Sequence, residues 1–142
     1  MPYDSPMFLE IIEPMREELT RVGFEELRTA PAVDAAFARS GVTLCVVNSI
    51  CGCAAGIARP AIADAVQAVK PDHLVTVFAG QDVESTKQAR SYFHGYAPSS
   101  PSVAILKDGE IAWMMERHQI EGHSSEAVRD ALVTALRQHT GA

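Results

Sequence analysis

The chain has 142 residues, 47% hydrophobic and 21% charged, which is the composition of an ordinary globular domain. We expect one domain, residues 1–142, that buries roughly two-thirds of its unfolded surface. A formal net charge of −6 argues against a nucleic-acid binder, which would carry a basic face. No apolar stretch approaches the roughly 18 residues of a membrane span, and residues 1–4 do not resemble a secretory signal. We therefore predict a cytoplasmic protein without nucleic-acid or membrane partners.

The N-terminal part of the chain predicts two helices with a short strand between them. Apolar residues recur at helical spacing over Met7–Val22, with Ser5 as the candidate N-cap. Pro14 falls inside this pattern and predicts either a kink or the true start of the helix. Phe24–Leu27 is a weak strand candidate. Thr29–Ser40 has the pattern of a short helix, with its first residue as the cap.

The middle of the chain alternates between apolar strands and helices. Val42–Val47 is a continuous apolar run, typical of a strand buried on both faces of a largely parallel sheet. The alanine-rich segment Ala54–Val69 predicts a helix, although Pro60 falls inside it. His73–Ala79 predicts a second buried strand, and Asp82–Phe93 a polar helix that follows it.

The C-terminal part predicts a loop over residues 95–101, a β-hairpin and a final helix. The hairpin joins Val103–Leu106 to Glu110–Met115 through an Asp-Gly turn, and the helix covers residues 124–138. The whole order predicts an α/β domain whose first strands are parallel and whose last two are antiparallel. This is the order of the thioredoxin fold, a central mixed sheet flanked by helices, here with an extra N-terminal helix.

Two cysteines separated by one glycine, Cys51-Gly52-Cys53, lie where the first buried strand should give way to the alanine-rich helix. In a regular helix, residues i and i+2 point roughly 200° apart, so we expect the pair to lie in the turn before the helix. Gly52 would give this turn backbone conformations that a side chain forbids. A disulfide in so small a ring would be strained and easily reduced, which favours thiol–disulfide chemistry.

The two thiols are expected to play different roles. Because the N-terminus of a helix favours an anion, Cys51 should be the more acidic thiol and the nucleophile. Cys53 should be less exposed, and we assign it as the resolving thiol. Arg59 is the cation nearest to the pair in sequence. Cys45, inside the strand, is interpreted as a small apolar core residue.

Metal binding is the sharpest alternative to redox chemistry for closely spaced cysteines. A structural zinc site takes four ligands, commonly at Cys-x₂₋₄-Cys or His-x₃₋₅-His spacing. Cys45 has the wrong phase, and His118 and His123 are distant in sequence, so we predict no metal site. We expect His118 to be solvated. In a reducing cytosol a cysteine pair is usually catalytic, redox-sensing or metal-binding.

Pro101 stands immediately before a predicted strand, where a proline is tolerated. A cis Ser100–Pro101 bond would place a backbone edge beside the cysteine loop, as happens at this point of the thioredoxin fold. A trans bond would only open the strand. Both alternatives stay open at the level of sequence, because cis bonds are about 5–6% of X–Pro bonds.

The residues around the cysteine pair resemble a known signature. Residues 46–60, Val-Val-Asn-Ser-Ile-Cys-Gly-Cys-Ala-Ala-Gly-Ile-Ala-Arg-Pro, are similar to the bacilliredoxins, small bacterial thioredoxin-like proteins with a Cys-Gly-Cys site. The similarity continues over residues 31–33, 78–82, 98–102, 107–110 and 116–122.

The resemblance implies an enzyme that removes bacillithiol from mixed disulfides on client proteins. Cys51 would attack the mixed disulfide, Cys53 or a second bacillithiol would resolve the adduct, and a flavin-dependent reductase would recycle the oxidised thiol. Bacillithiol is then a co-substrate, and no cofactor is bound. Asn48 and Arg59 match family positions near the site, as supporting residues. Disulfide isomerase or reductase activity on ordinary client disulfides is one alternative, and a non-enzymatic metal-binding or redox-sensing module is the other.

Overall fold

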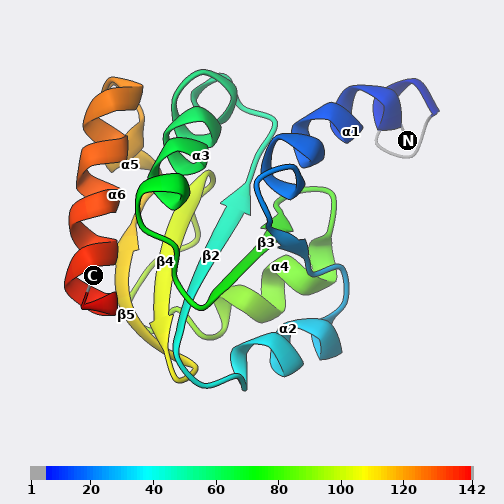
Figure 1. Cartoon of the computed structure of the whole chain (residues 1–142). Coiled ribbons are helices and arrows are strands. Elements are labelled where there is room, and N and C mark those ends of the chain that lie inside the picture. Colours follow the sequence, from blue (N-terminus) through cyan, green and yellow to red (C-terminus); the bar gives the residue numbers. More distant parts are fainter. Residues whose placement is uncertain (1–5, 142) are drawn as a thin grey trace.

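A five-stranded mixed sheet, with helices on both of its faces, forms the centre of the computed structural model, which describes residues 6–141 (Figure 1). The strand order is β1-β3-β2-β4-β5. β1, β3 and β2 run parallel, whereas β4 is antiparallel to β2 and β5 is antiparallel to β4. This arrangement confirms the predicted mixed sheet. The strands are β1 (Glu25–Glu26), β2 (Val42–Asn48), β3 (His73–Phe78), β4 (Ser102–Lys107) and β5 (Glu110–Met115).

The helices form two layers around the sheet. α3 packs against α6 on one face, and α2 packs against α4 on the other (Figure 1). The helical segments are α1 (Pro6–Thr20), α2 (Ala30–Phe37), the π-helical segment η2 (Ala54–Ala58), α3 (Arg59–Ala68), α4 (Val83–Arg90), α5 (Arg117–Ile120) and α6 (Ser125–Thr140). Within the described residues, no helix is both long enough and apolar enough to cross a membrane.

β2 is the centre of the core, because every one of its residues is buried. Its side chains alternate between the two layers, as the period of a strand requires. Leu44 and Val46 pack into the core under α3 and α6, whereas Cys45 and Val47 pack into the core under α2 and α4. The continuous apolar run in the sequence therefore reports a strand covered on both faces.

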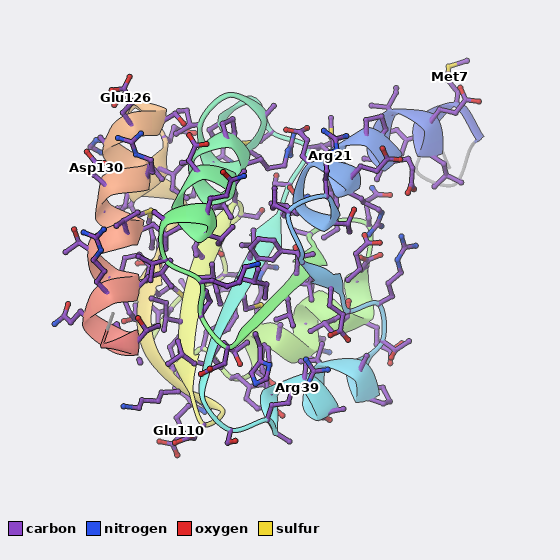
Figure 2. The ribbon with its side chains drawn as sticks, in the orientation of Figure 1. Met7, Arg21, Arg39, Glu110, Glu126 and Asp130 are labelled. Carbon is purple, nitrogen blue, oxygen red and sulfur yellow. The ribbon has the colours of Figure 1, made fainter. Side chains whose placement is uncertain are left out.

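α1 continues through Pro14, so the alternative that Pro14 marks the start of the helix is wrong. Ile12 and Leu19 are both buried, which anchors the helix to the body of the protein on either side of the proline. Figure 2 shows Met7 at the outer end of α1, away from the sheet. Ser5, the candidate N-cap, lies outside the described residues.

The segment after the cysteines is not the single α-helix expected over Ala54–Val69. It opens as a π-helix, in which the Arg59 N–H donates to the Ala54 carbonyl, and becomes α-helical only from Arg59. Pro60 accounts for the change, since it has no N–H to give to the carbonyl of residue 56 and would clash with it in an α-helix. Such π segments are frequent at functional sites.

The C-terminal elements follow their predicted order with one addition. Asp108 and Gly109 both have positive φ, 51° and 83°, as the tight hairpin turn requires. α5 was not predicted; it begins at a capping box between Glu116 and Gln119. Ser124 is the side chain that caps α6.

Candidate active site

Cys51 and Cys53 lie just beyond the carboxyl end of β2, both as free, partly exposed thiols. Ser49 shapes the loop between them and the strand, since its Oγ accepts the Cys51 N–H at 3.2 Å. The Ala54 N–H donates to the Cys51 carbonyl at 3.0 Å and starts the helical turn. The expected difference in exposure does not separate the two thiols, because both are partly exposed.

Their electrostatic surroundings do separate them. Burial alone would raise the pKa of Cys51. Hydrogen bonds from the Cys53 thiol and from the backbone N–H groups of Ala54 and Cys53 outweigh this, and the charge of Arg117 adds to them. The pKa of Cys51 therefore lies below its ordinary value, as a nucleophilic thiol requires.

The pKa of Cys53 is shifted in the opposite direction. Burial raises it first, followed by the hydrogen bond with Cys51 and by the negative charge of the Cys51 thiolate. Arg117 lowers it in part, and Glu121 raises it. The thiols thus titrate as a pair in which Cys51 holds the charge and Cys53 holds the proton. Cys45 takes no part, because burial raises its pKa to about 12.

Arg117, at the start of α5, is the cation that acts on both thiols. Its guanidinium donates to Glu121 Oε2, with Nη2 at 2.9 Å and Nε at 3.1 Å. Its Nη1 lies 3.4 Å from the Ser100 carbonyl oxygen, and its backbone N–H lies 3.4 Å from Ser99 Oγ. Arg117 therefore joins α5 to the loop before β4, and its charge acts on the cysteine pair.

Asn48 and Arg59 lie together beneath the cysteine loop. Arg59 is 2% exposed, and its Nη1 donates to Asn48 Oδ1 at 3.0 Å and to the Ser49 carbonyl at 2.8 Å. Asn48 Oδ1 also accepts the Ser49 N–H, and its Nδ2 donates to the Met15 carbonyl of α1. Arg59 Nε lies 3.2 Å from Glu18 Oε2, an ion pair without hydrogen-bond geometry. These contacts connect α1 to the backbone that carries Cys51.

Gly52 and Pro101 differ in exposure, because Gly52 lies at the surface of the protein and Pro101 lies inside it. Gly52 is exposed, has no positive φ, and a Cβ built on it would contact nothing within 4 Å. The expectation that its turn needs a conformation forbidden to side chains is therefore wrong for this dithiol form. Pro101 is buried, and the Ser100–Pro101 peptide bond is cis.

A metal site, the alternative to redox chemistry, would need several ligating side chains close together. Within the part of the chain that the structure describes, no group of three His, Cys, Asp or Glu side chains could hold a metal ion. His118 and His123 are exposed, as expected for His118.

Sequence reasoning missed three contributors to the site: Arg117, Glu18 and Ser49. Arg117 and Glu18 are far from the cysteines in the chain and reach them only through the fold. Arg117 does lie in one of the segments that resemble the bacilliredoxins, and this resemblance could have identified it as a site residue. Ser49, two residues before Cys51, has the hydroxyl type that commonly bonds a nearby backbone N–H.

Solved structures with the same architecture define the fold. The oxidised mitochondrial thioredoxin 3 of Saccharomyces cerevisiae matches with a TM-score of 0.61 at 12% identity, over 85% of this chain and 98% of the yeast chain. The oxidised thioredoxin of Plasmodium falciparum matches with a TM-score of 0.59 at 13% identity, over 80% and 99% of the two chains. The chain therefore has the thioredoxin fold, as predicted.

Curated relatives are much closer in sequence. The family described as "Disulphide isomerase" matches residues 8–140. A bacilliredoxin of Symbiobacterium thermophilum is 55% identical over 97% of this chain and 99% of its own. Those of Geobacillus kaustophilus and Staphylococcus aureus are 59% and 53% identical, over 89% and 91% of this chain and 88% and 90% of their own. With its thioredoxin fold, the chain is a thiol–disulfide oxidoreductase. It belongs to the bacilliredoxin family.

Proposed function

We propose that this protein removes bacillithiol from mixed disulfides on client proteins, through Cys51 and Cys53. The observation that carries the proposal is the opposite shift of the two thiol pKa values, down for Cys51 and up for Cys53. Bacillithiol is the small thiol that the resemblance to the bacilliredoxins implies, and the chain's membership of that family supports it. We place the reaction in the cytosol, where cysteine pairs serve catalysis and not structure.

In the first step, the Cys51 thiolate attacks the bacillithiol sulfur of the mixed disulfide. A Cys51–bacillithiol disulfide forms, the bond between bacillithiol and the client sulfur breaks, and the client leaves as a thiolate that takes a proton from water. The thiolate is the attacking species in all such exchanges, so the lowered pKa of Cys51 raises the fraction that can react at neutral pH.

The second step follows from the coupling between the thiols. Once Cys51 is part of a disulfide, it no longer carries the negative charge that raises the pKa of Cys53. Cys53 then loses its proton more easily and attacks Cys51 Sγ, which forms the Cys51–Cys53 disulfide and releases bacillithiol as a thiolate. Two molecules of a low-molecular-weight thiol supply the two electrons that restore the dithiol, and they leave joined as their own disulfide. A flavin-dependent reductase in turn reduces the disulfide of that thiol.

A release assay on a client protein modified with bacillithiol tests this function. Wild-type protein should release bacillithiol, Cys51→Ser should not, and Cys53→Ser should release the client thiol but retain bacillithiol on itself. Cys45→Ala is the matched control, since it removes a buried cysteine without touching the pair, and it should behave as wild type. Release by Cys51→Ser at the wild-type rate would show that the nucleophile is wrongly assigned.

Isomerase activity on ordinary disulfides is a second candidate function, favoured by the description of the matching family. It uses the same thiols on a different substrate. Recovery of activity from a scrambled, disulfide-containing protein, compared with the rate of bacillithiol release, separates the two. A protein that unscrambles disulfides but leaves bacillithiol in place would be an isomerase.

A further inference from the structure

A groove separate from the thiol pair lies beside α4. It has a volume of about 430 Å³, within the range of small-ligand sites. Asn48 of β2 pairs with Phe78 of the parallel β3, so the cysteine loop and the Gly80 turn leave the same edge of the sheet. The Gly80 side of the groove therefore lies at the same end of the sheet as the thiols. Its lining residues are Gly80, Val83, Thr86, Lys87, Arg90 and Pro98.

Arg90 is a partly buried cation without a partner of opposite charge among the described residues. Within residues 7–141 no Asp or Glu side chain forms an ion pair with it. Its Nη2 donates to the Ser99 carbonyl at 3.2 Å, but its buried Nε has no acceptor. Arg16, by contrast, is paired with both Asp82 and Glu26. A desolvated charge without a counter-ion is unfavourable, and an anion in the groove would relieve it.

The buried hydroxyl of Thr86 is independent evidence for a ligand in the groove. This residue is 3% exposed, and its Oγ1 has no hydrogen-bond partner in the part of the chain that the structure describes. Buried hydroxyl groups normally have a hydrogen-bond partner, and an atom of a bound ligand would provide one for Thr86 Oγ1. Lys87 adds a second cation to the lining, while Val83, 68% exposed, and Pro98 add apolar surface. This lining suits a small molecule that presents a carboxylate to Arg90.

The loop before β4 connects the groove to the thiols. The Ser99 carbonyl accepts from Arg90 on the groove side. The Ser99 hydroxyl and the Ser100 carbonyl lie 3.4 Å from the nitrogens of Arg117, whose charge acts on Cys51. A ligand in the groove would therefore lie across this loop from the reacting sulfur.

We propose that this groove binds a carboxylate, paired with Arg90, and that during turnover the carboxylate belongs to the low-molecular-weight thiol of the mixed disulfide. The second half of the proposal rests on the proposed function. The groove then selects which small thiol is removed, whereas Cys51 and Cys53 carry out the exchange.

A binding measurement tests whether the groove holds a carboxylate. The reduced full-length protein, labelled with ¹⁵N, is titrated with succinate and with succinamide, which has the same carbon chain without charge. Succinate should produce saturating shifts of the amides over residues 83–90, and succinamide should not. Equal effects of the two compounds, or no effect of succinate, would overturn the groove as a carboxylate site.

Variants show whether Arg90 is the partner. Arg90→Gln should weaken succinate binding at least tenfold. Thr86→Val, which keeps the side-chain shape, should weaken it by a smaller factor. Lys107→Gln on the hairpin is the matched control and should bind as wild type. Succinate binding that survives Arg90→Gln unchanged in a folded protein would contradict the assignment.

Enzyme kinetics test whether the bound carboxylate belongs to the small thiol of the mixed disulfide. One client protein is modified either with bacillithiol, which carries a carboxylate, or with cysteamine, which has none. Arg90→Gln should lower the ratio of the two kcat/KM values, bacillithiol over cysteamine, about tenfold, through KM for the bacillithiol substrate. An equal loss on both substrates would indicate a merely structural role. Wild-type protein that binds succinate but leaves the bacillithiol disulfide intact would keep the groove, and would overturn both the small thiol as its ligand and the proposed function.

Discussion

Each thiol of the pair sets the protonation of the other. The hydrogen bond between them stabilises the Cys51 thiolate and opposes ionisation of Cys53. Backbone N–H groups at the start of the helical segment strengthen the same bias. The hydrogen bond between the thiols and these backbone N–H groups together lower the pKa of Cys51, while burial and the Cys51 thiolate raise the pKa of Cys53.

The first prediction concerns the titration of these thiols. Followed by thiolate absorbance near 240 nm, Cys51 should ionise below the ordinary cysteine range and Cys53 above it. In Cys51→Ser, the pKa of Cys53 should fall, because the charge that raised it is gone. Cys45 should stay silent in this pH range, since burial raises its pKa to about 12. A Cys53 pKa that does not move would show that the thiols are independent.

The second prediction concerns Arg117. Arg117→Gln removes a positive charge near the thiolate, so the pKa of Cys51 should rise and its alkylation at neutral pH should slow by a few-fold. The pH–rate curve should move to higher pH with its plateau unchanged. Arg137→Gln, which removes an exposed charge from α6, is the control and should leave the curve in place. An identical curve for both variants would remove Arg117 from the site.

At the scale of secondary structure, α1 supports the cysteine loop. Asn48 Nδ2 donates to a carbonyl of α1, and Arg59 pairs with Glu18 of α1 while it donates to the backbone of the loop. The π-helical segment Ala54–Ala58 ends just before Arg59, whose side chain is buried beneath the cysteine loop. The N-terminal helix is therefore part of the architecture of the site.

The third prediction tests that support. Glu18→Gln leaves the buried Arg59 guanidinium without its carboxylate, so the free energy of unfolding should fall by about 1–3 kcal/mol. Glu17→Gln, on the neighbouring exposed position of α1, should change it by less than about 0.5 kcal/mol. Urea denaturation measures both. Equal stabilities of the two variants would show that the Glu18–Arg59 contact contributes nothing.

The sequence predicted the elements well where one local signal dominates. β2, the hairpin and α6 follow from an apolar run, an Asp-Gly turn and a serine cap. The π-helical turn was missed because five alanine-rich residues are too few to distinguish the periods of the two helix types, and only Pro60 indicated a change. α5 was missed because four residues are too few to show a period, although its capping box was readable.

At the scale of the whole molecule, the fold brings the site together from distant parts of the chain. Cys51 and Cys53 were predictable from spacing and resemblance, because they are adjacent in sequence. The influence of the Arg117 charge on the pair, the ion pair of Arg59 with Glu18 and the groove beside α4 depend on how sheet and helices pack. No local pattern encodes such contacts.

The fourth prediction concerns the packing of the hairpin against α2. A Cβ at Gly109 would lie 2.5 Å from the Phe37 carbonyl oxygen, whereas one at Gly122 would contact nothing within 4 Å. Both glycines have similar positive φ, 83° and 81°, so alanine is strained equally at both. Gly109→Ala should therefore be at least about 1 kcal/mol less stable than Gly122→Ala, because of overpacking. Equal melting temperatures of the two variants would contradict this packing.

The identity of the sulfur that receives bacillithiol is the most direct test of the whole account. Cys53→Ser protein is incubated with a bacillithiol-modified client and then digested, alkylated and mapped by mass spectrometry. Cys45 and Cys51 share a peptide, so we predict fragment ions that place bacillithiol on Cys51 and the alkyl group on Cys45. Bacillithiol that stays on the client, or that appears on Cys45 in place of Cys51, would show that Cys51 is not the nucleophile.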